Sequence, residues 1–458
     1  MRGMAAARSI SVFGLGKLGA PLAVVLASKG FAVVGVDRNS RLVAALEAGE
    51  APQAEPGLQE LLSIAADRIR ATTDANAAVQ ASEASFVVVP TPSLPDGTFS
   101  NAHVISAVQE IGLSLRHKPG YHLVVIASTV MPGSMDGPIR KALEAACGRC
   151  IGDSLGLCYS PEFIALGSVI HDMLHPDLVL IGESDQRAGD GLEAVYRSFY
   201  ENRPAIRRMG FINAELTKIA LNAFVTTKIS FANMLSELCD HLPEADAAVV
   251  TSALGEDSRI GSKYLKPALG FGGPCFPRDN AALASVARHL NTSADISHAS
   301  DSINRRQVAR MTKLVRSLRR HGTIGILGLS YKPNTAVIEG SQSIAMAAAL
   351  ADLGYRVLVS DPEALGAASA VLGTKAEPVP AEMCAASADV LIIATPWACY
   401  RDLPAEALRR PGSILPVIDC WRLLPPALTQ IVDLIYLGRH QSSRNPVSRR
   451  ATSVGERA

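Results

Sequence analysis

Two stretches of the chain, one near each end, repeat the same order of strand and helix signals. SISVFGLG is followed by a helix-like segment and FAVVGVD, and TIGILGLS is followed by a helix-like segment and YRVLVSDP. Each half then has a later apolar run that ends in Thr-Pro, SFVVVPTP (85–92) and DVLIIATP (389–396). Continuous β-branched runs that alternate with helical patterns are typical of parallel sheets buried on both faces. The sequence therefore predicts an α/β protein with two doubly wound domains.

A long helix is predicted between the two repeats. The segment from Asn213 to about Asp240 contains no Gly or Pro and has apolar residues at helical spacing. At 1.5 Å per residue such a helix is roughly 40 Å long. Helices of this length commonly join domains or pack against a second copy in a dimer.

Composition excludes several classes of partner. The 458 residues include 44 Lys and Arg against 43 Asp and Glu, so we expect neither nucleic acid nor an anionic membrane as a partner. No uninterrupted apolar run reaches the roughly 18 residues of a membrane span. Eight scattered cysteines suit a cytoplasmic location, and the single CxxC (147–150) has no second ligand pair, so we expect no metal. The polar, basic tail at 441–458 is expected to be disordered.

The first repeat carries a dinucleotide fingerprint, GLGKLG (14–19), between a predicted strand and a predicted helix. Gly14 permits the tight turn, Gly16 lets the backbone approach a pyrophosphate, and Gly19 lets helix and strand pack closely. Asp37 ends the next strand, 18 residues after Gly19, where a carboxylate accepts from ribose hydroxyls and repels a 2′-phosphate. This pattern favours NAD over NADP, although the neighbouring Arg38 weakens the preference.

The second repeat keeps only part of this fingerprint. Gly325 and Gly328 supply two of the three glycines, and Lys332 follows as a point charge for a phosphate. The pattern favours a different nucleotide ligand, such as the carrier of the substrate. A fold retained without any ligand is the alternative.

GFGGPCFPRD (270–279) is the most informative decapeptide. Glycines and prolines around Cys275 predict a rigid loop whose backbone amides lie close to a ligand. A cysteine held there is suited to attack an aldehyde while neighbouring groups stabilise the oxyanion. A buried structural cysteine is an equally weighted interpretation of the loop alone.

Further polar residues stand where chemistry is feasible. Lys218 and Asn222 share one face of the long helix at i and i+4, a pair able to polarise an alkoxide or carbonyl, although a solvated lysine is the commoner outcome. Ser128 and Thr129 end the strand YHLVVIAST, and Glu162 follows another strand. Ligands bind at such strand ends in α/β sheets, but ordinary helix caps occur there too.

Taken together, these segments resemble the UDP-glucose/GDP-mannose dehydrogenase family. GLGKLGAP, STVMPG, SPEFIALG, the long helix, RIGSKYLKPALGFGGPCFPRD and GLSYKPNT occur in the family's order between about Ser9 and Leu437. The resemblance implies two Rossmann-like domains joined by a central helical dimerisation domain. The expected boundaries are 1–205 for NAD binding, 206–310 for the helical domain with the Cys loop, 311–440 for nucleotide-sugar binding, and the tail 441–458. It also implies at least a homodimer.

The resemblance implies a four-electron oxidation of a sugar C6 alcohol to a carboxylate with two NAD, through a thiohemiacetal and a thioester. The implied catalytic residues are Cys275, Lys218, Asn222, Asp279, Glu162 and Thr129. The implied cofactor-binding residues are Gly14, Gly16, Lys17, Leu18, Gly19, Asp37, Arg41, Pro90, Thr91, Ser128 and Thr129. The implied substrate-binding residues are Glu162, Phe163, Lys218, Asn222, Arg259, Tyr264, Lys266, Phe271, Gly272, Gly273 and Lys332, with Arg259 reaching a neighbouring subunit's substrate.

The chain departs from the family pattern at several positions. Leu166 stands where a second carboxylate is frequent, and Arg278 replaces a lysine. Ala336, Val337 and Glu339 replace two acids and an arginine after GLSYKPNT. The Cys loop favours UDP-glucose as the substrate, with UDP-N-acetylmannosamine and GDP-mannose as alternatives. A two-electron 3-hydroxyacid dehydrogenase and a non-catalytic nucleotide-binding protein are the rival functions.

Overall fold

The computed structural model describes residues 7–440. Contacts divide the chain into two compact units: the first runs as far as Asn222 and includes Arg278–Ala294, and the second comprises Ala223–Pro277 and the chain from Asp295 onward. The three domains expected from the sequence do not coincide with these two units, and their boundaries stay a prediction. The expected disordered tail, 441–458, lies outside the described residues.

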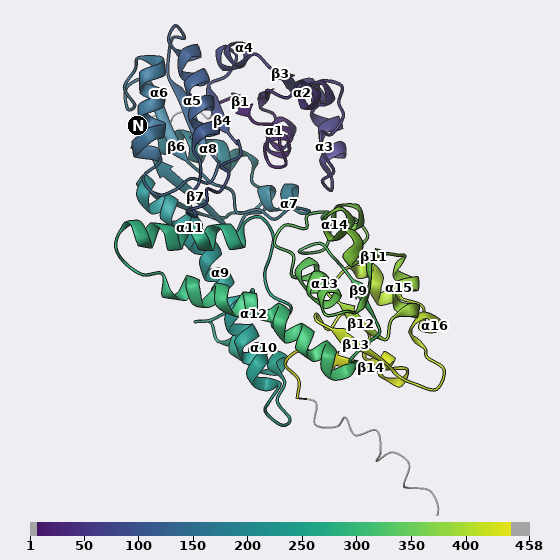
Figure 1. The fold of residues 1–458 in the computed structure, drawn as a ribbon. Coiled ribbons are helices and arrows are strands. Elements are labelled where there is room, and N and C mark those ends of the chain that lie inside the picture. Colours follow the sequence, from purple (N-terminus) through teal and green to yellow (C-terminus); the bar gives the residue numbers. More distant parts are fainter. Residues whose placement is uncertain (1–6, 441–458) are drawn as a thin grey trace, which may run out of the picture. The chain divides into compact units, whose positions relative to one another are not determined.

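The first unit is built on an eight-stranded sheet in the order β3-β2-β1-β4-β5-β6-β7-β8 (Figure 1). The first six positions follow the doubly wound Rossmann order, and the glycine turn lies where the order reverses, after β1. The strands are β1 (Ser9–Phe13), β2 (Ala32–Val36), β3 (Ile69–Thr72), β4 (Ala84–Val87), β5 (His122–Ile126), β6 (Leu155–Tyr159), β7 (Leu178–Glu183) and β8 (Ala205–Met209).

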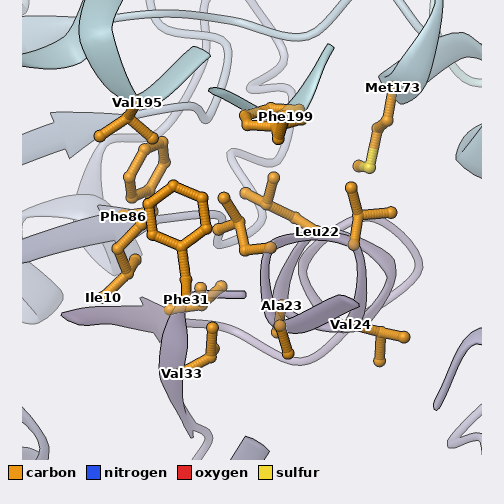
Figure 2. Close-up of a cluster of buried hydrophobic side chains, with 14 of the residues drawn as sticks. Ile10, Leu22, Ala23, Val24, Phe31, Val33, Phe86, Met173, Val195 and Phe199 are labelled. Carbon is orange, nitrogen blue, oxygen red and sulfur yellow. The ribbon is translucent and has the colours of Figure 1, made fainter. Parts of the chain in front are cut away.

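Two apolar clusters cover the two faces of this sheet. Figure 2 shows one of them, to which β4 contributes Phe86, α1 Leu22, α7 Met173 and α8 Phe199. The opposite face is covered mainly by α5 and α6. The helices are α1 (Gly19–Ser28), α2 (Ser40–Glu47), α3 (Leu58–Ala65), α4 (Ala75–Gln80), α5 (Ala102–Leu115), α6 (Arg140–Cys147), α7 (Val169–Leu174) and α8 (Gln186–Phe199).

One strand pair departs from the all-parallel expectation, since β7 runs antiparallel to β6. The chain leaves the carboxyl end of β6, forms an irregular loop and the short helix α7, and enters β7 from the same edge. A parallel pair would need a crossover, and the apolar run of β7 in the sequence gives no sign of strand direction. Glu162 follows the end of β6 by three residues and so lies at the carboxyl edge of this strand.

The second unit contains a six-stranded parallel sheet in the order β11-β10-β9-β12-β13-β14, which repeats the same strand order. The predicted repeat is therefore confirmed. Its strands are β9 (Thr323–Leu327), β10 (Arg356–Ser360), β11 (Glu377–Pro378), β12 (Val390–Ile393), β13 (Leu415–Asp419) and β14 (Val432–Tyr436). Its flanking helices are α13 (Gln342–Asp352), α14 (Leu365–Leu372), α15 (Ala381–Ser387) and α16 (Ala405–Leu408).

Long helices make up the central part of the chain. The predicted rod is α9 (Phe211–Cys239), and the others are α10 (Ala247–Glu256), α11 (Phe276–His289) and α12 (Asp295–Leu318). The unit boundary falls within α9, after Asn222, and within α11, before Arg278. Of the helices in the described part of the chain, none combines the length and apolarity that a membrane crossing requires.

Candidate active site

The glycine turn of the first unit has the geometry that its sequence predicts. Gly14 has φ +96°, and a Cβ added at Gly19 would lie 1.8 Å from the Gly14 carbonyl oxygen. Gly16 is different, because a Cβ added there meets nothing within 4 Å and the residue is exposed. Gly14 and Gly19 therefore serve the fold, whereas Gly16 leaves an open backbone surface of the kind a pyrophosphate approaches. Lys17 is exposed and Leu18 half-buried in the same turn.

Asp37 is fixed against this turn. Its carboxylate accepts from the backbone N–H of Leu15 at 2.7 Å and of Asn39 at 2.8 Å, and it remains partly exposed. Two bonds leave acceptor positions for ribose hydroxyls. Arg38 is turned toward α5, where it pairs with Glu110, so it is engaged away from the Asp37 carboxylate. Arg41 is exposed in the first turn of α2.

The ends of β4 and β5 are tied together by side chains. The Ser128 hydroxyl accepts from the Val89 N–H at 2.9 Å, and the Thr91 hydroxyl donates to the Thr129 carbonyl at 2.7 Å. Thr91 also accepts at 2.9 Å from Arg278, whose guanidinium lies 3.8 Å from the centre of the Phe99 ring. Pro90 is exposed beside Thr91.

Arg278 was not among the predicted site residues. Its position next to Asp279, as an arginine where the family has a lysine, was the only signal in the sequence.

A buried polar cluster lies beyond the carboxyl edge of the sheet. Lys218 of α9 donates to the Glu162 carbonyl at 2.6 Å, and its ammonium lies 4.4 Å from the centre of the Phe163 ring. Asn222, one turn further along α9, donates to the Asp279 carboxylate at 2.6 Å. Lys218 and Asp279 are 7% and 3% exposed, so the solvated-lysine interpretation is wrong.

Burial controls the electrostatics of this cluster. Loss of solvent raises the pKa of Glu162 to about 7, and the positive charge of Lys218 opposes the rise. Burial likewise raises the pKa of Asp279, against the lowering effects of Lys218, of the Asn222 hydrogen bond and of Arg278. Perturbed carboxyls beside a buried cation are typical of sites that move protons.

Leu166 occupies an apolar position. It packs with Ile164 and Ile170 against the hydrophobic cluster of Figure 2. A carboxylate in that place would lose its solvation. Glu162 and Asp279 are carboxyls on whose pKa the charge of Lys218 acts.

The glycines of the Cys loop are required by close packing within the second unit. A Cβ added at Gly272 would lie 2.4 Å from the Gly340 carbonyl oxygen, and one at Gly273 would lie 2.5 Å from the Tyr331 ring. Asn304 of α12 clamps Phe271, accepting from its N–H at 2.8 Å and donating to its carbonyl at 2.9 Å. The loop is thus held rigidly, as the sequence predicts, and Cys275 itself is exposed. The buried structural cysteine is therefore the wrong alternative.

Cys275 and the polar cluster belong to different units. Cys275 precedes α11 in the second unit, and Asp279, four residues later, belongs to the first. Tyr331 is a residue that sequence reasoning did not select. Burial raises its pKa to about 12, with a smaller contribution from a negative charge on Cys275.

The remaining predicted substrate-binding residues differ in how far they are exposed to solvent. Phe271 is buried, Lys332 half-buried, and Tyr264 and Lys266 exposed. Tyr264 has φ +62°, an uncommon left-handed conformation for a non-glycine residue. Arg259 pairs with Asp257 of the same turn at 2.6 Å and is exposed. Glu339 is exposed, and its carbonyl accepts from the Gly273 N–H at 2.8 Å.

The second Rossmann-like turn has lost its free carboxylate. Asp361 ends β10 as Asp37 ends β2, but it is 4% exposed. It accepts from the N–H groups of Leu329 and Ser330 at 2.7 and 3.0 Å and from the Trp397 indole at 3.2 Å. These bonds all go to Oδ2, and Oδ1 accepts from the N–H groups of Glu363 and Ala364 at 2.9 and 2.7 Å, so both oxygens are already used within the fold. A cavity nearby is lined by the Cys loop and the turn after β9, including Gly270, Gly272, Ser330, Tyr331 and Trp421.

Sequence models of one family match the chain along most of its length. The UDP-glucose/GDP-mannose dehydrogenase NAD binding domain matches residues 8–200, the central domain 212–306 and the UDP binding domain 325–426. The chain belongs to this family. The predicted resemblance and the expected cofactor, NAD, are therefore confirmed.

Individual relatives agree with the family models. The UDP-glucose 6-dehydrogenase of Haloferax volcanii is 38% identical over 360 residues, which cover 78% of this chain and 83% of that protein. The GDP-mannose 6-dehydrogenase of Pseudomonas aeruginosa is 33% identical, covering 77% and 80%. The solved structure of a UDP-glucose dehydrogenase from Pyrobaculum islandicum is 35% identical, with a TM-score of 0.84 and coverage of 95% and 98%.

Proposed function

We propose that this family member oxidises the C6 alcohol of a nucleotide sugar to a carboxylate, with UDP-glucose as the favoured substrate. The observation that carries the proposal is the polar cluster of buried Lys218 and Asp279 with half-buried Asn222 and Glu162, together with the loop that holds Cys275 four residues before Asp279. A two-electron hydroxyacid dehydrogenase needs no cysteine in such a loop.

The chain's residues suit each step of this chemistry. Lys218 and Asn222 stabilise negative charge on the reacting oxygen, and a carboxylate of the cluster accepts protons. Loss of the hydroxyl proton and of a first hydride turns the C6 alcohol into an aldehyde. The Cys275 thiolate adds to the aldehyde carbon, and the resulting thiohemiacetal loses its hydroxyl proton and a second hydride to become a thioester. Water assisted by Glu162 or Asp279 then breaks the C–S bond and releases the acid. Covalent capture retains the reactive aldehyde.

The residues of the first unit fit the cofactor. Gly16 leaves open backbone at the N-terminus of α1, and Asp37 keeps a partly exposed carboxylate at the end of β2. Bound NAD would supply a hydride acceptor for each of the two oxidations.

The substrate preference is argued from the Cys loop and from relatives. GFGGPCFPRD favours UDP-glucose, and two of the similar proteins described above are UDP-glucose dehydrogenases. The Pseudomonas aeruginosa relative is named a GDP-mannose 6-dehydrogenase, so the alternative sugars are included in the same experiment.

The deciding measurement is the number of NADH molecules formed per limiting nucleotide sugar. Purified protein is given UDP-glucose, UDP-N-acetylmannosamine or GDP-mannose with excess NAD. Two NADH per UDP-glucose are expected. Two from another sugar alone would keep the reaction and change the substrate. One NADH per sugar would mean that oxidation stops at the aldehyde and would contradict the four-electron reaction, and none from any sugar would contradict the proposal as a whole.

We also propose a homodimer. The second unit exposes apolar side chains on one face of α9, Phe224, Phe231 and Leu238, and further ones on α10, Val249 and Val250. Phe224 and Val249 are 65% and 67% exposed. Exposed apolar residues that share one face of a helix, as on α9, are typical of association surfaces.

A further inference from the structure

The segment between α2 and α3, residues 51–57, connects two parts of the candidate site within the first unit. It has no regular secondary structure. Gln53 donates from its side-chain amide to the Gly16 carbonyl at 3.0 Å, which places this segment against the glycine turn. Two residues later, Glu55 reaches a stretch of chain more than one hundred positions away in sequence.

Glu55 uses both carboxylate oxygens on the backbone that follows Glu162. Oε2 accepts from the Gly167 N–H at 3.1 Å, and Oε1 accepts from the Val169 N–H at 2.8 Å. These donors lie at the start of α7, where backbone N–H groups have no helical partner. Hydrogen bonds that such N–H groups donate to a carboxylate are stronger than those they donate to a neutral oxygen.

The loop that carries Glu162 has other supports as well: Lys218 donates to the Glu162 carbonyl at 2.6 Å, and Ile164 and Leu166 pack against the apolar core. Residues 161–165 form no regular secondary structure between β6 and α7. Ser160 fixes the start of the loop by donating to the Leu180 carbonyl at 2.8 Å. Further along, Asp172 accepts from the Ala165 N–H at 3.1 Å. Glu55 is the support that comes from the side of the dinucleotide turn.

We propose that Glu55 is a positioning residue that fixes the position of the Glu162 loop relative to the dinucleotide site. Gln53 links the segment that carries Glu55 to the glycine turn. The proposal rests on the proposed function, because it assigns Glu162 a part in the reaction. It adds a residue that touches neither reacting atoms nor cofactor.

The surroundings of Glu162 supply a readout that a general loss of stability would not move. Burial raises the pKa of its carboxyl and Lys218 from α9 opposes the rise, while Tyr200 and Asp172 of α7 line the same cavity. A loosened loop admits water, and the raised pKa of Glu162 then falls toward the ordinary value of a glutamate. The low-pH limb of a kcat profile reports this change.

The test compares Glu55→Ala with Glu60→Ala, an exposed acid of the adjoining helix α3, in the full chain. Glu55→Ala is expected to lower kcat by about tenfold, less than the roughly 10²–10⁴-fold that loss of a general base itself would cost. It should also shift the low-pH limb of the kcat profile to lower pH and leave the KM for NAD within about twofold. Glu60→Ala should change none of these quantities. Glu55→Gln keeps one acceptor and should recover part of the loss.

Hydrogen exchange gives a second measure that does not depend on activity. Amides of residues 163–169 should exchange faster in Glu55→Ala than in the unsubstituted protein or Glu60→Ala. Unchanged exchange, or a kcat loss with an unmoved limb, would overturn the proposal. If the unsubstituted protein forms no NADH from any sugar, the proposed function fails, and exchange alone then decides whether Glu55 holds the loop.

Discussion

Glu162 is unusual among the carboxyls of the chain because its pKa is raised to about 7 by burial, despite the nearby charge of Lys218. A carboxyl with this pKa is mostly protonated at pH 6 and mostly ionised at pH 8. If the ionised form serves as the base, the rate rises with pH through this window.

We therefore expect kcat to increase as pH rises through about 7. Glu162→Gln should lower kcat by about 10²–10⁴-fold and remove this limb, because an amide accepts no proton. The pH profile of NADH formation checks the prediction. Glu50→Gln, at an exposed position of the same unit, is the control and should keep the limb. A normal limb in Glu162→Gln would assign it to another group, with Asp279 next in line.

Cys275 tests the covalent step at the same scale. Cys275→Ser should abolish formation of the acid, because a hydroxyl at neutral pH is a far weaker nucleophile than a thiolate. Binding of NAD should stay within about twofold of the unsubstituted protein, since Gly16 and Asp37, which fit the cofactor, are left unchanged. Product analysis and NAD titration check both statements. Cys399→Ser, at another exposed cysteine of the second unit, should keep full activity.

At the scale of elements, different glycines of the turn between β1 and α1 serve folding and cofactor binding. Gly19→Ala forces a methyl group into the Gly14 carbonyl, whereas Gly16→Ala meets no protein atom. Gly19→Ala should lower the melting temperature by several degrees, as an overpacked site costs about 1–3 kcal/mol. Gly16→Ala should melt normally but bind NAD at least about tenfold more weakly. Calorimetry and NAD titration distinguish them, and equal melting temperatures would contradict the assignment.

Local sequence signals predicted the elements that depend on local chemistry. The strands that precede GLGKLG and GLS, the rod α9 and the i, i+4 pair of Lys218 and Asn222 follow from periodicity and glycine placement. The direction of β7 was missed because an apolar run reads the same in either direction. Glu55 and Arg278 were missed because their partners lie 112–114 and 187 positions away, a pairing that no local pattern encodes.

At the scale of the whole molecule, the exposed face of α9 predicts association. Phe231→Glu places a charge among the apolar residues of the second unit and should shift the protein from dimer to monomer, because burying an unpaired charge is costly. Sedimentation at several concentrations checks this. Ile64→Glu, at a 76% exposed position of α3, is the control and should stay dimeric. A monomeric unsubstituted protein would contradict the proposed assembly.

The interleaving of the two units bears on how the chain is made. The first unit includes residues 278–294, and Asp279 and Asn280 from this stretch are 3% and 0% exposed. During synthesis, which proceeds from the N-terminus, its interior stays incomplete until the segment 223–277 of the other unit has already emerged. A fragment that ends at residue 222 would accordingly lack part of its own interior. Complementation with a second fragment starting at residue 223 would restore that part.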